Sequence, residues 1–77
     1  MAIQNIQIQK IEDIANIILV NRKKSKLSRD KLALLSGVGK TAIYNIEHGK
    51  ITYQIDTLLK IFEVLNIKIY INAPFNE

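Results

Sequence analysis

The sequence predicts a mainly α-helical domain of four to five helices, followed by one short β-strand. Apolar residues recur at intervals of three and four along most of the chain, which is the period of an amphipathic helix. Serine, glycine and asparagine residues interrupt this pattern where short helices would begin and end. Near the C-terminus the apolar period changes to two, which is typical of a strand.

Length and composition are those of one small globular domain. The chain has 77 residues, of which 48% are hydrophobic and 23% are charged, a balance typical of folded rather than disordered proteins. It has no tryptophan and only three tyrosines and two phenylalanines, so we expect an aliphatic core. Because so small a domain buries a limited share of its surface, we expect it to gain stability from a partner.

Several classes of function lack the residues they need. The chain has no cysteine and its one histidine is His48, so we expect no disulfide, no metal site and no cofactor. No side chains form a recognisable catalytic set, and we expect no enzyme. We see no secretory signal and no apolar run near the roughly 20 residues of a membrane span. The expected location is the cytoplasm, without a membrane partner.

The first helix is predicted over residues 10–24, after an N-terminal arm formed by residues 1–9. The arm alternates loosely between apolar and polar residues, so a short strand is the alternative. Acidic Glu12 and Asp13 lie in the first turn of the helix and a basic run lies in its last turn, as the helix dipole favours. The expected apolar stripe consists of Ile11, Ile14, Ala15, Ile18 and Leu19.

Two short helices follow, separated by a tight turn. Ser28 is a good N-cap for the second helix, and its buried side is expected to comprise Leu32, Ala33 and Leu35. Gly37 can adopt the left-handed conformation that ends a helix. The third helix is predicted from about residue 39 to residue 48, with Ile43 and Ile46 facing inward. Its outward side carries Lys40, Thr41, Tyr44 and Asn45.

A fourth helix is predicted over residues 55–65, with an apolar face formed by Ile55, Leu58, Leu59, Phe62 and Leu65. In the tail, Ile67, Ile69 and Ile71 alternate with polar residues and predict a strand. An isolated strand leaves its backbone groups without partners. We therefore expect it to pair with the same strand of a second copy about a two-fold axis. The alternatives are a disordered tail and pairing with residues 6–9. The expected divisions are an arm (1–9), a helical domain (10–66) and a dimerisation strand and tail (67–77).

Positive charge is concentrated in the middle of the chain. Residues 22–50 contain eight lysines and arginines against two acidic residues, a net charge of +6, whereas the flanks together carry −2. This distribution favours a face that binds a polyanion. An ordinary solvated surface is the alternative explanation of the charge.

The strongest motif covers residues 27–50, which read LSRDKLALLSGVGKTAIYNIEHGK. This segment resembles the helix-turn-helix of the Cro/repressor-like family, also called the xenobiotic-response-element family. The matching elements are Leu-Ser at the start, Leu-Ala within the second helix, the Gly-Val turn and the closing Ile-x-x-Ile-Glu-x-Gly-Lys. Arg29 and Gly39 depart from the family pattern. The Gly-Lys-Thr within the segment is not a phosphate-binding loop, since that motif needs a further glycine and a preceding strand.

The resemblance implies a lambda-repressor-like fold in which residues 10–66 form the helix-turn-helix DNA-binding domain. It also implies a role for each polar residue of the motif. The base-contacting residues would be Lys40, Thr41, Tyr44 and Asn45, and the phosphate-contacting residues would be Ser28, Arg29, His48 and Lys50. Arg22 and Glu47 match a buried ion pair of the family with a structural role. A helix of this kind fits the major groove of DNA.

The order of motif, leucine-rich helix and terminal strand resembles the HipB-like antitoxins. This resemblance implies a bacterial homodimer that binds a palindromic operator in double-stranded DNA and represses its own operon. It also implies a protein partner, namely a HipA-type kinase toxin or its split subunits. The alternatives are a phage- or plasmid-type repressor without a toxin partner, and an interaction module that no longer binds DNA.

Overall fold

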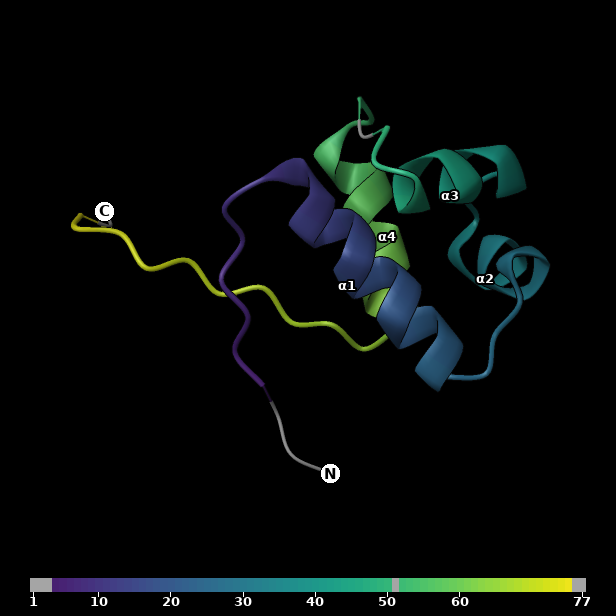
Figure 1. The fold of residues 1–77 in the computed structure, drawn as a ribbon, viewed down its shortest axis with the longest axis horizontal. Coiled ribbons are helices and arrows are strands. Elements are labelled where there is room, and N and C mark those ends of the chain that lie inside the picture. The colour runs from purple at the N-terminus through teal and green to yellow at the C-terminus, as the bar shows by residue number, and fades with distance from the viewer. Residues whose placement is uncertain (1–3, 51, 76–77) are drawn as a thin grey trace.

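The computed structural model describes residues 4–50 and 52–75, and within these ranges it contains four α-helices and no strand. The helices are α1 (Ile11–Lys24), α2 (Arg29–Ser36), α3 (Lys40–Glu47) and α4 (Ile55–Val64). The prediction of a mainly helical domain is therefore confirmed. Figure 1 shows α2 and α3 together at one end of the molecule, while the described parts of the N-terminal arm and the C-terminal tail lie on the other side of α1.

Local side-chain and backbone geometry determines where the helices begin and end. At the start of α1, the Asp13 carboxylate accepts hydrogen bonds from the backbone N–H groups of Gln9 (2.8 Å) and Lys10 (3.1 Å). These bonds hold the pKa of Asp13 below its ordinary value. At the start of α2, Ser28 Oγ accepts from the Lys31 N–H at 3.0 Å, the cap that the sequence predicted. Gly37 ends α2 with φ at 73°, the left-handed conformation that glycine adopts without strain.

Two other helix ends place a residue with a β-carbon in the left-handed region. Lys26 follows α1 and Asn66 follows α4, and each has φ at 59°. In both cases the next N–H turns back to the helix: Leu27 donates to the carbonyl of Arg22 at 3.1 Å, and Ile67 donates to that of Phe62 at 2.8 Å. These bonds satisfy carbonyl groups that a helix end otherwise leaves without partners.

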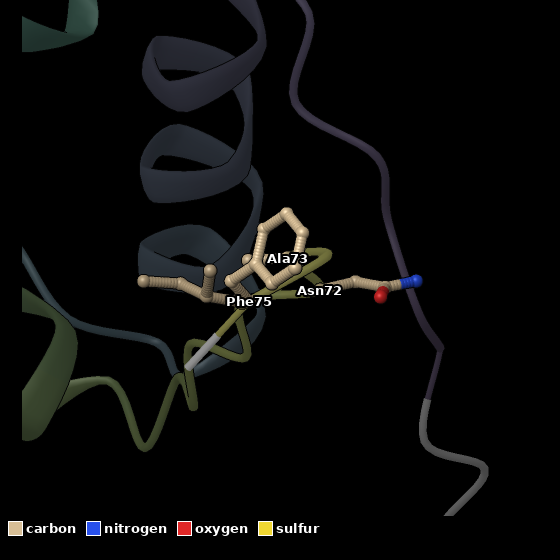
Figure 2. A pocket seen from close by; sticks show the side chains of 4 residues that line it. Asn72, Ala73 and Phe75 are labelled. Atoms are coloured by element: carbon tan, nitrogen blue, oxygen red, sulfur yellow. The ribbon is translucent and has the colours of Figure 1, made fainter. Parts of the chain in front are cut away.

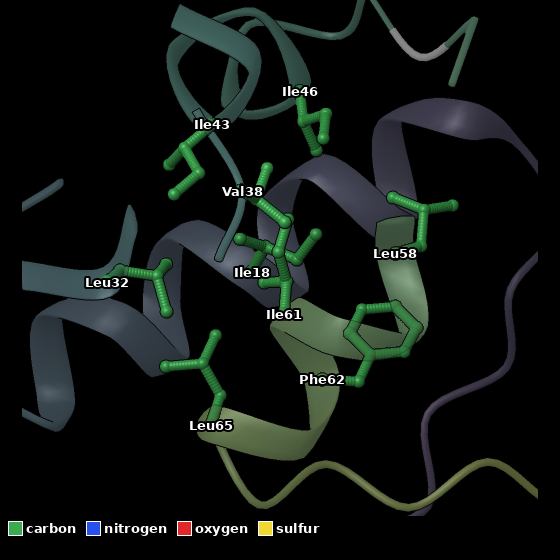
Figure 3. Close-up of a cluster of buried hydrophobic side chains, with 9 residues drawn as sticks. All are labelled: Ile18, Leu32, Val38, Ile43, Ile46, Leu58, Ile61, Phe62 and Leu65. Atoms are coloured by element: carbon green, nitrogen blue, oxygen red, sulfur yellow. The ribbon is translucent and has the colours of Figure 1, made fainter. Parts of the chain in front are cut away.

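The core is aliphatic apart from one phenylalanine, as the composition predicted. Figure 3 shows its side chains converging from all four helices and from the turn between α2 and α3. Ile43 and Ile46 of α3 are both 0% exposed, so the inner face of α3 is fixed to the rest of the domain. The cluster consists of Ile18, Leu32, Val38, Ile43, Ile46, Leu58, Ile61, Phe62 and Leu65.

Some residues predicted to be buried are not. Leu35 of α2 is 52% exposed, and Ile55 and Leu59 of α4 are 71% and 46% exposed. Ile61, which the predicted face of α4 omitted, is fully buried. The stripe of α4 that packs on the core is thus rotated relative to the prediction. Since α4 is apolar around most of its circumference, its sequence period fits more than one stripe.

The tail does not form the predicted strand in this single chain. Residues 68–75 run away from the domain without strand pairing, and Ile71 is 87% exposed. Ile67 packs against the core, whereas Ile69 is 46% exposed. A strand needs a neighbour to which it can hydrogen-bond, so pairing across a dimer stays a prediction. The ends of the predicted arm and tail, residues 1–3 and 76–77, lie outside the described residues.

An open groove of about 920 Å³ lies between the N-terminal arm, the end of α1, the end of α4 and the tail. Its apolar lining includes Ile8 of the arm, Ile17 and Val20 of α1, and Phe62 and Leu65 at the end of α4. A second hollow, of about 470 Å³, is lined only by four tail residues around Asn72, Ala73 and Phe75. Figure 2 shows that this second hollow is formed by a bend of the tail itself.

In the described parts of the chain, no helix has the length and apolar character needed to cross a bilayer.

Candidate nucleic-acid interface

The outward face of α3 is polar and accessible. Lys40, Thr41 and Tyr44 are exposed, while Ile43 and Ile46 on the inward face are completely buried. Residues four apart lie on the same side of a helix. Lys40 and Tyr44 therefore form one row along α3, and Thr41 and Asn45 form the next. The short helix thus presents four polar side chains from a surface that the core holds in place.

A buried carboxylate connects α3 to the two preceding helices. The side chain of Glu47, at the end of α3, is 0% exposed. Arg22 of α1 donates from Nε to Glu47 Oε2 at 2.6 Å and from Nη2 to Oε1 at 3.2 Å. Arg29 of α2 donates from Nε to Glu47 Oε1 at 2.9 Å. The structure thus contains the Arg22–Glu47 pair that the resemblance implied, together with a second arginine on the same carboxylate.

The charges of this cluster keep Glu47 ionised. Burial by itself would raise the pKa of Glu47, but the hydrogen bonds and charges of Arg22 and Arg29 outweigh burial and hold that pKa below its ordinary value. Arg22 Nη1 also donates to the carbonyl of Leu27 at 2.9 Å. Within the described residues, no buried side-chain nitrogen or oxygen lacks a hydrogen-bond partner. The ion pairs are therefore accompanied by the hydrogen bonds that buried charges need.

Arg29 also contacts an aromatic pair at the surface of α3. Its guanidinium carbon lies 5.3 Å from the centroid of the Tyr44 ring. The Tyr44 ring in turn stacks on the ring of His48, with centroids 4.0 Å apart and planes inclined by 25°. His48 Nδ1 lies 2.7 Å from the carbonyl oxygen of Tyr44. A hydrogen bond there requires the proton on Nδ1, which leaves Nε2 as the other ring nitrogen available for contacts.

Two further contacts were not expected from the sequence. Lys40 Nζ lies 3.0 Å from Asp30 Oδ1, and both side chains are largely exposed, at 66% and 70%. Asn45 is half-buried, and its Nδ2 donates to the Tyr53 hydroxyl at 3.4 Å. Asp30 precedes Lys40 by ten positions and Tyr53 follows Asn45 by eight. No helical spacing links either pair, so no periodic signal in the sequence could have indicated them.

The predicted phosphate-contacting residues differ in how accessible they are. Ser28, His48 and Lys50 are exposed, and Arg29 is half-buried. Ser28 Oγ already accepts the capping hydrogen bond of α2, although its own hydroxyl proton is still available to donate. Arg22, one of the eight basic residues counted in segment 22–50, is buried against Glu47. Its charge is therefore not part of the exposed basic surface.

Comparison with known proteins identifies the family of this chain. A family model described as "Helix-turn-helix" matches residues 21–71, which include α2, α3 and α4. This chain belongs to that helix-turn-helix family. It is also 39% identical over 62 residues to the HTH-type transcriptional regulator y4mF of Sinorhizobium fredii, a match that covers 80% of this chain and 82% of y4mF. The chain is thus an HTH-type, DNA-binding transcriptional regulator.

Solved structures of regulators share this fold. A HipB variant in complex with an O2 20mer superposes with a TM-score of 0.81 at 19% identity, covering 94% of this chain and 100% of that one. The restriction-modification controller protein C.AhdI from Aeromonas hydrophila gives 0.70 at 24% identity, covering 75% and 88%. An HTH_3 family transcriptional regulator from Vibrio cholerae gives 0.69 at 38% identity, covering 75% of this chain and 33% of its own. In DNA complexes of helix-turn-helix proteins the second helix of the motif lies in the major groove, and α3 is the second helix of the motif in this chain.

Within residues 4–50 and 52–75, potential metal ligands do not gather. No group of three or more His, Cys, Asp or Glu side chains there could hold a metal ion. His48 stacks on the Tyr44 ring, and its Nδ1 lies 2.7 Å from the Tyr44 carbonyl oxygen.

Proposed function

We propose that this regulator is a homodimeric repressor that reads a palindromic operator through α3 and represses its own operon. One observation carries the proposal: a polar face with Lys40, Thr41 and Tyr44 exposed on a helix whose opposite face is fully buried. The buried Glu47 anchors that helix to α1 and α2. A helix held rigidly in this way can enter the major groove without first being ordered.

The side chains of α3 have the chemistry of direct base reading. Lys40 can donate to O6 and N7 of guanine, and the methyl group of Thr41 can contact the methyl of thymine. Asn45 can pair with adenine if its amide leaves the 3.4 Å contact with Tyr53. Tyr44 completes the base-contacting set. Around these residues, Ser28, Arg29, His48 and Lys50 would contact phosphates and set the register of the helix on the duplex.

The tail supports the proposed dimer. Ile69 and Ile71 are exposed in the single chain, as are Ile6 and Ile8 of the arm. Pairing of two tails about a two-fold axis would satisfy the backbone groups of the tail strands and cover these apolar side chains. Such a dimer would place its two copies of α3 in successive major grooves, about 34 Å apart. This spacing matches the half-sites of a palindromic operator.

We further propose that the regulator is the antitoxin of a HipA-type kinase toxin. The support comes from the fold: HipB in a HipA–HipB–O2–O3 complex superposes with a TM-score of 0.81 at 20% identity, covering 92% of this chain and 100% of that one. The superposition covers most of this chain and is not limited to the helix-turn-helix. A phage- or plasmid-type repressor would share the DNA-binding surface but would lack the protein partner.

Fluorescence anisotropy with the DNA upstream of the gene tests the DNA-binding proposal. The regulator should bind this duplex at least 10³-fold more tightly than a scrambled duplex, with affinity that falls steeply between 50 and 200 mM salt. Equal affinity for both duplexes would contradict sequence-specific reading.

A pull-down of the native protein with its upstream DNA tests the proposed toxin partner. Recovery of the dimer and DNA without any kinase-like protein would support the repressor without a toxin.

A further inference from the structure

Arg29 contacts two groups with different roles at the start of α2. Its Nε donates to the buried Glu47 carboxylate at 2.9 Å, and its guanidinium carbon lies 5.3 Å from the centroid of the exposed Tyr44 ring. Its side chain is 34% exposed, whereas that of Glu47 is 0% exposed. Arg29 therefore links a carboxylate that is fixed inside the domain, Glu47, to an aromatic ring on the outward face of α3, Tyr44.

The Tyr44 ring is constrained although it lies at the surface. Tyr44 is 49% exposed, and an exposed aromatic side chain ordinarily samples more than one rotamer. Here the ring lies beneath the guanidinium of Arg29 and stacks on His48, with ring centroids 4.0 Å apart. Cation–π and aromatic contacts each favour a particular ring position. The combination restricts where the tyrosine hydroxyl and ring edge meet a bound duplex.

The contact requires the planar guanidinium of arginine. The Glu47 carboxylate holds the guanidinium by Nε while its delocalised plane covers the ring, a combination that the compact ammonium of lysine does not reproduce. A lysine at this position would keep the positive charge toward DNA phosphates. The two roles of Arg29, charge and ring positioning, can therefore be separated by one substitution.

We propose that Arg29 is a positioning residue for sequence reading: anchored by Glu47, it fixes the Tyr44 ring so that Tyr44 discriminates the base pair it meets. The proposal rests on the proposed role of α3 as the base-reading element. It differs from a phosphate contact, which sets affinity and register but carries no sequence information. Glu47 would thereby contribute both to the stability of the domain and to the discrimination of base pairs by Tyr44.

The test compares R29K, Y44A and the double variant on a set of duplexes, each with one operator base pair changed. We expect Y44A to lose preference at one or two base pairs by about tenfold, within the range typical of a good base contact. R29K should lose preference at the same base pairs, and the double variant should match Y44A alone. Any loss of R29K affinity for scrambled DNA measures the separate phosphate contact of Arg29, so base preference is scored as the ratio of affinities for the operator and for each changed duplex.

A control and a second measurement keep the outcome decisive. K31A changes another basic residue of α2, one that is exposed, and should leave base preference unaltered whatever its effect on affinity. If R29K weakens binding equally on every duplex, or if Y44A retains all base preferences, the positioning role is overturned.

NMR couplings of the Tyr44 side chain should show rotamer averaging in DNA-free R29K but not in the unmodified protein. A single rotamer in both proteins would overturn the positioning role as well. Failure of the unmodified protein to prefer its operator would instead contradict the proposed function.

Discussion

Replacement of Glu47 by glutamine is expected to destabilise the domain strongly. The change preserves the size of the side chain but removes the only carboxylate that Arg22 and Arg29 contact in the described structure. Arg22 is only 7% exposed, so its charge would remain buried without compensation. Breaking such a pair costs about 3–5 kcal/mol, a large share of the roughly 5–15 kcal/mol that stabilises a typical domain. Arg29 is more accessible and can relax toward solvent, which favours the lower end of that range.

Urea unfolding and thermal melting followed by circular dichroism measure this effect. A loss of about 3 kcal/mol should lower the melting temperature by about 12 °C or more in a domain of this size. Glu63→Gln is the matched control, because it removes the same charge from an exposed position on α4 and should melt close to the unmodified protein. If the two variants melt alike, the buried ion pair does not anchor α3 and the reasoning is wrong.

The remaining predictions address acid stability, a turn, the basic surface and the dimer. Because the folded-state pKa of Glu47 is lowered from 4.5, its stabilisation is complete above that value and is lost as the pH falls through the folded-state pKa. Urea midpoints should therefore drop below about pH 4.5 in the unmodified protein but change less in Glu47→Gln, and parallel acid profiles would contradict this. Gly37→Ala should cost about 1 kcal/mol in urea unfolding from the left-handed backbone alone, since a β-carbon there meets no atom within 4 Å; a cost above about 3 kcal/mol would reveal a steric clash instead. Asp30→Asn should raise DNA affinity severalfold at low salt in anisotropy titrations, because it releases Lys40 from a 3.0 Å ion pair and removes a negative charge from the surface; unchanged or weaker binding would argue that Asp30 lies away from the duplex. Ile69→Lys should shift the protein toward the monomer in sedimentation experiments, whereas an unchanged dimer would place the interface elsewhere.

The helices could be predicted from the sequence because their signals are local. Hydrophobic period, the Ser28 cap and the Gly37 turn gave helix ends within one or two residues of those observed. Period alone could not orient α4, where Ile55 and Ile61 are equally apolar but only Ile61 is buried. Which side of such a helix faces the core depends on where its neighbours pack.

The site was predicted in part, and the reasons differ from residue to residue. The outward placement of Lys40 and Thr41 follows from helical spacing within the motif. The pair between Arg22 and Glu47, which are 25 positions apart, was available only through the family resemblance. The contact of Asn45 with Tyr53 and the ring stack of Tyr44 with His48 depend on rotamers and on packing between elements. Helical spacing places Tyr44 and His48 on the same side of α3 but does not give their ring stack, and it contains no information on the contact between Asn45 and Tyr53.

The proposed regulation depends on binding of the operator by the outward face of α3. The most direct test measures operator affinity by anisotropy for a Lys40→Ala, Thr41→Ala double variant, in which both replaced side chains are exposed. Lys60→Ala, an exposed lysine of α4 outside the helix-turn-helix, is the control for loss of charge. We predict at least a tenfold loss of operator affinity for the double variant, little change for the control, and thermal melting of both near that of the unmodified protein. Undiminished operator affinity in a double variant that melts normally would contradict operator binding through α3.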